Sequence, residues 1–163
     1  MRSSVCSELL HHFDADEALA VDSSPPEFAK WLDTVTLPWN LQHLLRFDWP
    51  QKSGYIGHLR IMSAQELLAD EFLGSLLRHQ LLPIGSAPNG DTLVIRTGSD
   101  QCEVGFLTHE EYWEHQEDPL TVYQPIARTL DSLLYRLVEG RYIPTDYYAA
   151  KEFNAFLADE RSA

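Results

Sequence analysis

Residues 81–108 read LLPIGSAPNGDTLVIRTGSDQCEVGFLT, and this stretch decides the fold class. Its three apolar runs are separated by Asn89-Gly90 and by Gly98-Ser99-Asp100, residues that tolerate the positive φ angles of tight turns. The pattern therefore predicts an antiparallel β-meander. We expect its three strands at 81–87, 92–97 and 102–108. The middle run, Leu93-Val94-Ile95, shows little alternation, which predicts a central strand covered on both faces.

Helical patterns precede the meander. A capping box at residues 24–27 opens one helix, and residues 41–45 place three leucines on one face of a second. Residues 55–62 alternate well enough for a strand, and a capping box that begins at Ser63 predicts a helix over 63–79. A further short helix is expected at Val5–Phe13.

Helical patterns also follow the meander. A third capping box at Thr108–Glu111 predicts one or two helical turns over residues 109–115. The cleanest amphipathic pattern begins at Pro125 and ends at Gly140, and Thr145 is expected to cap a last helix. Because the helices lie outside a mainly antiparallel sheet, the predicted fold class is α+β and not doubly wound α/β.

The length of 163 residues suits one domain. We expect an acidic N-terminal arm at residues 1–23 and an α+β domain at residues 24–160. The start lacks the apolar run of a signal peptide, and no apolar stretch is long enough to cross a membrane. These features predict a cytoplasmic domain with no membrane partner.

The charge distribution suggests the kind of partner. The formal net charge is −13, which argues against a nucleic-acid partner and permits a basic protein. Residues 97–127 carry seven acids and no lysine or arginine. We expect the partner-binding site in this segment, and the alternative is a solvated face that only aids solubility. The candidate partner-binding residues are Glu110, Glu111, Tyr112, Trp113, Glu114, Glu117 and Asp118.

Catalytic and metal-binding patterns are weak in this sequence. His109 and His115 are six residues apart and would diverge on a helix, so no metal site and no cofactor are predicted. Asp91, His58 and His109 can be combined into an acid–base hypothesis, but no nucleophile motif accompanies them. The prediction is a protein that is not an enzyme, and a small hydrolase or metal protein is the minor alternative.

Several of these motifs together resemble the SUKH superfamily. The resemblance is carried by Leu37–Leu45, by Leu82–Ile95 with its Ile-Gly and Gly-Asp pairs, by Val104–His109, and by the helical pattern of Ile126–Leu134. It covers about residues 26–138. One departure is Asp48-Trp49-Pro50, at the position where family members commonly carry Asn-Gly-Gly, so the loop after the first helical hairpin must be built differently.

The resemblance implies an α+β domain without catalytic residues. Many bacterial SUKH proteins are immunity proteins that neutralise a toxin, often a nuclease, and others are regulatory interaction modules. We therefore expect stoichiometric binding of a basic toxin domain through the acidic segment, by a monomer or weak homodimer. The alternative is a regulatory scaffold that binds a cellular protein through an apolar groove near Trp31, Trp39 or Trp49.

Overall fold

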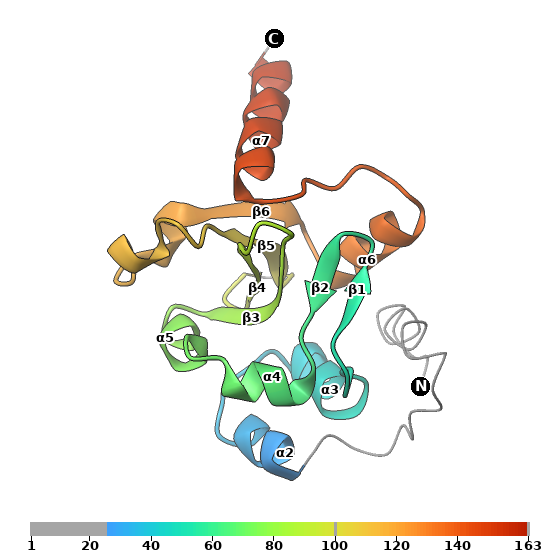
Figure 1. Cartoon of the computed structure of the whole chain (residues 1–163), viewed down its shortest axis with the longest axis vertical. Helices are drawn as coiled ribbons and strands as arrows, with labels where there is room; N and C mark the ends of the chain where they lie inside the picture. Colours follow the sequence, from blue (N-terminus) through green and yellow to red (C-terminus); the bar gives the residue numbers. More distant parts are fainter. Residues whose placement is uncertain (1–25, 100, 163) are drawn as a thin grey trace.

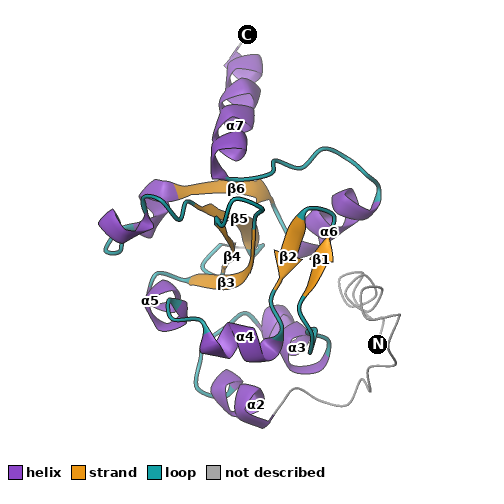
Figure 2. Ribbon diagram, in the orientation of Figure 1, coloured by secondary structure: helices purple, strands orange, loops and turns teal. Residues whose placement is uncertain are grey.

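The structure, a computed structural model, describes residues 26–99 and 101–162. It confirms the α+β class, because six antiparallel strands form one sheet in chain order and helices surround it (Figures 1 and 2). The strands are β1 Gly54–Ile56, β2 Leu59–Ile61, β3 Leu81–Ser86, β4 Thr92–Arg96, β5 Glu103–Leu107 and β6 Tyr123–Ala127. The helices are α2 Pro26–Leu32, α3 Trp39–Phe47, α4 Ala64–Ala69, α5 Leu73–Arg78, α6 Leu130–Val138 and α7 Tyr147–Ser162, with 3₁₀ turns η1 Tyr112–Glu114 and η2 Pro119–Val122. The expected arm at 1–23, the helix at 5–13 and the Ser24 cap lie outside the described residues.

The centre of the sheet is buried on both faces, as the central apolar run predicts. In β4, Leu93 and Ile95 belong to the main core, and Val94 belongs to a second, smaller core; all three are fully buried. The main core also takes residues from α2, α3, α4 and α6. The second core joins Leu76 of α5 to Tyr112 and Val122 from the segment between β5 and β6. That segment therefore has a packing role as well as a surface.

Two elements expected before the meander are each divided in two. Residues 55–62 form a hairpin and not one strand, because Gly57 adopts φ +57° and Ile56 pairs with Leu59. The helix expected over 63–79 begins at the predicted capping box, in which Ser63 and Glu66 exchange hydrogen bonds, but it breaks after α4. The carboxylate of Asp70 accepts a hydrogen bond from the Phe72 N–H at 2.9 Å, a local side-chain contact that competes with the helical backbone.

The region after the meander also differs from the expectation. Residues 123–127 form the sixth strand, and Pro125 pairs with Gly105 there, so Ile126 lies in a strand and not in a helix. Helix α6 begins later, where the Thr129 hydroxyl accepts a hydrogen bond from Ser132 N–H at 3.0 Å. Its end at Gly140 is as predicted, because Gly140 has φ +67° and donates to Leu137. The last helix is capped by the Asp146 carboxylate and not by Thr145.

Helices α6 and α7 pack against the β5–β6 end of the sheet. Helix α6 packs against β1, β5 and β6, and so touches both edge strands of the sheet. The first turns of α7 cover β5 and β6 through buried Tyr147 and Ala150, and the rest of the helix projects from the body (Figure 1). Among the described helices, none has the length and apolar character needed to cross a bilayer.

Candidate functional site

The acidic segment between β5 and β6 forms a loop of turns and short 3₁₀ helices. We call residues 109–122 the acidic loop. The prediction of an α-helix over 109–115 is wrong, because only the 3₁₀ turn η1 forms there. The buried Thr108 hydroxyl has no hydrogen-bond partner among the described residues and does not cap this turn. Because Leu107 of β5 pairs with Tyr123 of β6, the chain must leave and return to the same point of the sheet. Figure 1 shows this excursion at the side of the sheet, between β5 and β6.

Tyr112 and Trp113 have opposite environments. Tyr112 is 6% exposed, packs in the second core, and places its hydroxyl 3.3 Å from the Ser75 hydroxyl. Trp113 is 63% exposed. Tyr112 therefore holds the loop on the sheet, and Trp113 is the aromatic ring that a partner can reach.

The carboxylates of the acidic loop lie at the surface. The exposed acids are Glu110, Glu111, Glu114, Glu117 and Asp118. Because the expected helix is absent, Glu110, Glu114 and Glu117 do not share one helical side. Within residues 26–99 and 101–162, no lysine or arginine forms an ion pair with any of these acids. The loop thus presents carboxylates that no lysine or arginine in the described part of the chain neutralises through an ion pair.

Two of these acids have neutral hydrogen-bond donors. Glu110 accepts a hydrogen bond from the Tyr148 hydroxyl at 2.9 Å, which raises the pKa of Tyr148. Asp118 accepts one from the Thr121 hydroxyl at 2.9 Å. These contacts orient two carboxylates without removing their charge.

Asp91 anchors the start of the loop from below the surface. Its carboxylate has no exposed area and accepts four hydrogen bonds, divided equally between its two oxygens. Oδ1 accepts from the backbone N–H of His109 at 3.0 Å and from its ring Nδ1 at 2.7 Å. Oδ2 accepts from the Asn89 side chain and the Tyr147 N–H, each at 2.9 Å. One buried group therefore ties the β3–β4 turn, the acidic loop and α7 together.

The hydrogen bonds also determine the protonation of Asp91. Burial by itself would raise the pKa of this carboxyl group. The donors on Asn89, Tyr147 and His109 outweigh burial and hold the pKa of Asp91 below its usual range. Asp91 is thus a charged structural centre, and its contacts account for its burial.

The acid–base hypothesis combined Asp91, His58 and His109. The structure brings Asp91 and His109 together, but it places His58 elsewhere, with Nε2 3.3 Å from the Pro144 carbonyl oxygen. A histidine whose ring is oriented by a buried carboxylate can act as a general base. Among the described residues, no group of three metal-ligating side chains is found.

An aromatic cavity adjoins the acidic loop. It has a volume of about 210 Å³. Phe72, Tyr112 and Trp113 form aromatic walls, and Glu71 and His109 lie on the same lining. The sequence predicts one continuous helix over 63–79 and gives no binding role to Glu71 or Phe72. No local signal joins residues 71–72 to 112–113, because their contact depends on the helix break after α4.

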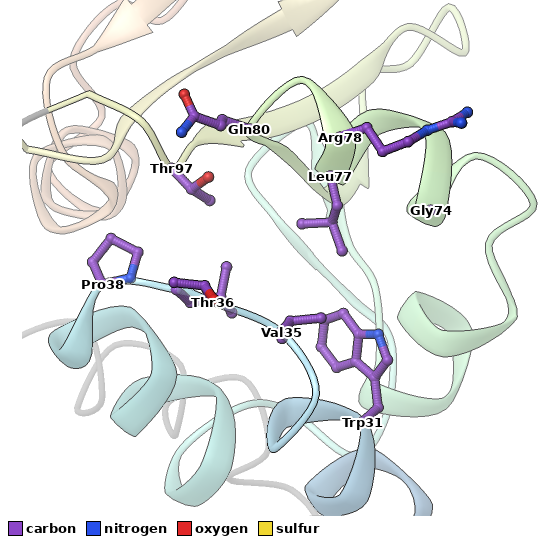
Figure 3. A pocket seen from close by; sticks show the side chains of 10 residues that line it. Trp31, Val35, Thr36, Pro38, Gly74, Leu77, Arg78, Gln80 and Thr97 are labelled. Carbon is purple, nitrogen blue, oxygen red and sulfur yellow. The ribbon is translucent and has the colours of Figure 1, made fainter.

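The apolar-groove alternative also has a structural counterpart (Figure 3). A cavity of about 770 Å³ lies between the α2–α3 connection and α5, and Trp31 and Leu77 point toward one another across it. The other two tryptophans named for this alternative are not among its lining residues. Trp49 is buried and donates to the Met62 carbonyl oxygen, and Trp39 is 72% exposed on α3, stacked on His43.

Comparisons with protein-family models, with curated proteins and with solved structures each gave no match. The SUKH resemblance therefore stays a prediction from short motifs, and the assignment of function depends on the chemistry of the surfaces described above.

Proposed function

We propose that this domain is a non-catalytic inhibitor of the immunity type, which blocks a basic toxin domain by stoichiometric binding through the acidic loop. The observation that supports this proposal is the set of five exposed carboxylates without ion-pair cations among the described residues. A nuclease surface that binds the phosphate backbone is basic, and carboxylates can occupy the same positions as phosphates. In this proposal the domain acts in the cytoplasm as a monomer or weak homodimer, and its activity requires no metal, cofactor, nucleic acid or membrane.

The anchoring of the loop supports the same proposal. Tyr112 and Val122 are buried near its two ends, and Asp91 holds His109 at its start. A loop that is already ordered loses less conformational entropy when it binds. Opposite charges across an interface also accelerate association and make it sensitive to salt.

The test uses a matched pair of variants with equal changes in charge. The first carries Glu110→Gln, Glu114→Gln and Glu117→Gln; the control neutralises three exposed acids of α7, Glu152, Asp159 and Glu160. Binding to a cognate basic toxin domain is measured by calorimetry at increasing salt. We expect the loop variant to lose about tenfold to hundredfold in affinity and most of the salt dependence, whereas the control stays near wild type. Equal losses in both variants would contradict the assignment.

The apolar cavity of Figure 3 favours a second candidate function, a regulatory scaffold. Its lining includes Trp31, Val35 and Leu77, and its volume lies in the range of ordinary ligand sites. For a partner that binds there, Leu77→Asp should abolish binding, and affinity should change little with salt. This result, together with wild-type behaviour of the acidic-loop variant, would replace the first proposal with the second.

A further inference from the structure

The aromatic cavity beside the acidic loop has walls that leave a concave space. The centre of the Phe72 ring lies 5.1 Å from the centre of the Tyr112 ring and 5.1 Å from that of Trp113. The interplanar angles are 80° and 74°, so Phe72 meets both rings nearly edge to face. Tyr112 is fixed in the second core, whereas Trp113 is largely exposed. One wall is therefore rigid, and the outer one is accessible to a partner.

The charge around this cavity is negative. Glu71 is exposed on its lining, and the chain next to Tyr112 and Trp113 carries Glu111 and Glu114. Neither lysine nor arginine is among the lining residues of the part of the chain that the structure describes. The negative faces of aromatic rings attract cations, and nearby carboxylates add to that attraction.

The size of the cavity limits what can enter it. A volume of about 210 Å³ is below the range of about 300–1,000 Å³ typical of sites for drug-sized ligands and cofactors. A single long side chain from a protein partner suits this space. Buried central anchors of this kind carry much of the binding energy in protein interfaces.

We infer that the aromatic cavity binds an arginine side chain of the basic partner, with the guanidinium group stacked on Trp113 and facing Glu71. This inference rests on the proposed function, because it names the partner group that the acidic loop receives. Arginine fits better than lysine, since its planar guanidinium is weakly hydrated and stacks on aromatic faces. The carboxylates of the acidic loop attract the partner, and the cavity selects the side chain.

The test uses a small probe and the full chain. N-acetyl-arginine methylamide is titrated into the protein, and the indole N–H resonances of the tryptophans are followed by NMR; the citrulline analogue is the neutral control of equal shape. We expect a saturable shift at Trp113 and at least about tenfold weaker binding of the citrulline compound. Trp113→Ala should remove saturable arginine binding, and Glu71→Gln should weaken it severalfold. Trp39→Ala, which removes an exposed ring outside the cavity, should leave it unchanged.

Equal affinity for the arginine and citrulline compounds would overturn the inference, as would undiminished arginine binding by Trp113→Ala. An octalysine peptide distinguishes this failure from failure of the proposed function. Octalysine binding that depends on Glu110, Glu114 and Glu117, without arginine-selective binding at Trp113, would retain the acidic loop as the binding surface and reject the cavity. The opposite result is arginine-selective binding at Trp113 together with octalysine binding that does not depend on those glutamates. It would retain the cavity as the arginine site and reject the acidic loop as the binding surface.

Discussion

Replacement of Asp91 by asparagine tests how the acidic loop is held. The side chain has no exposed area, and all four of its hydrogen-bond partners are donors. Asparagine keeps the shape but exchanges one acceptor oxygen for an NH₂ group. Whichever way the amide lies, its NH₂ group faces a backbone N–H donor, that of His109 or that of Tyr147.

The expected loss of stability follows from these contacts. A hydrogen bond to a charged group contributes about 1.5–3 kcal/mol, and a buried donor left unpaired costs about 1–3 kcal/mol. Part of this free-energy loss is recovered, because water can satisfy the side-chain donors of His109 and Asn89. The His109 side chain is 43% exposed, and the Asn89 side chain lies in an exposed turn. One backbone N–H, of His109 or Tyr147, is left without an acceptor. We expect Asp91→Asn to lower the free energy of unfolding by about 3 kcal/mol.

Urea denaturation at neutral pH measures this loss. The matched control is Asp118→Asn, at an exposed acid of the same loop, which should change the free energy of unfolding by less than about 0.5 kcal/mol. Amide hydrogen exchange adds a local readout, since the N–H groups of His109 and Tyr147 should lose protection first. A loss below about 1 kcal/mol for Asp91→Asn would refute the argument that this carboxylate holds the loop.

The difference in stability between wild type and Asp91→Asn should depend on pH in a definite direction. The pKa of Asp91 is lower in the folded protein than in the unfolded chain, where it is about 3.9. The stabilisation from the charged form is therefore fully present above that value and is lost as the pH falls through the lower, folded pKa. Asparagine does not titrate, so the difference in stability between wild type and Asp91→Asn should narrow in acid. A constant difference down to the acid transition would contradict the lowered pKa of Asp91.

Three further predictions concern single side chains. A Cβ at Gly105 would overlap the Gln124 carbonyl oxygen and the Tyr123 ring, so Gly105→Ala should destabilise the fold by about 1–3 kcal/mol in urea denaturation; Gly74→Ala, in open space on α5, should be neutral or stabilise by up to about 1 kcal/mol. Burial and the nearby Glu103 carboxylate raise the pKa of Tyr123, so its phenolate absorbance should be missing from an alkaline titration of the native protein and appear on unfolding. Burial raises the pKa of the Cys102 thiol, so in a Cys6→Ser variant a thiol reagent should react slowly with native protein and rapidly in urea; rapid native reaction would contradict this.

The sequence predicts the centre of the sheet well, because local signals agree there. Strands β3, β4 and β5 lie close to their expected bounds, and the positive φ of Gly90 fits the turn assigned to Asn89-Gly90. The capping box at Ser63 is confirmed for the same reason: its two partners are three residues apart and need no tertiary contact.

Other errors occur where tertiary contacts override a local pattern, unlike the local breaks at Gly57 and Asp70. Strand β6 contains Pro125 and lies at the edge of the sheet, where proline is tolerated. The apolar residues from Ile126 onward have helical spacing, so the sequence predicts a helix in place of this strand. The capping box at Thr108–Glu111 is the same kind of pattern as that at Ser63, yet only the 3₁₀ turn η1 forms there, where Tyr112 packs in the second core. The aromatic cavity is invisible for the same reason, because it joins segments that are about 40 residues apart.

The distribution of side chains along the acidic loop separates folding from function. Folding accounts for Tyr112 and Val122, because the second core would be open to water without them. It does not account for Glu114 or Glu117, which are exposed and have no ion-pair partner among the described residues, or for the exposure of the Trp113 indole. An exposed aromatic ring beside unpaired carboxylates contributes little to the stability of the free domain, whereas a basic partner can bury the ring and neutralise the charge in one step. The same 14 residues of the acidic loop, 109–122, thus close the sheet on one side and offer a binding surface on the other, so variants of Tyr112 should lose stability first and variants of Trp113 should lose binding first.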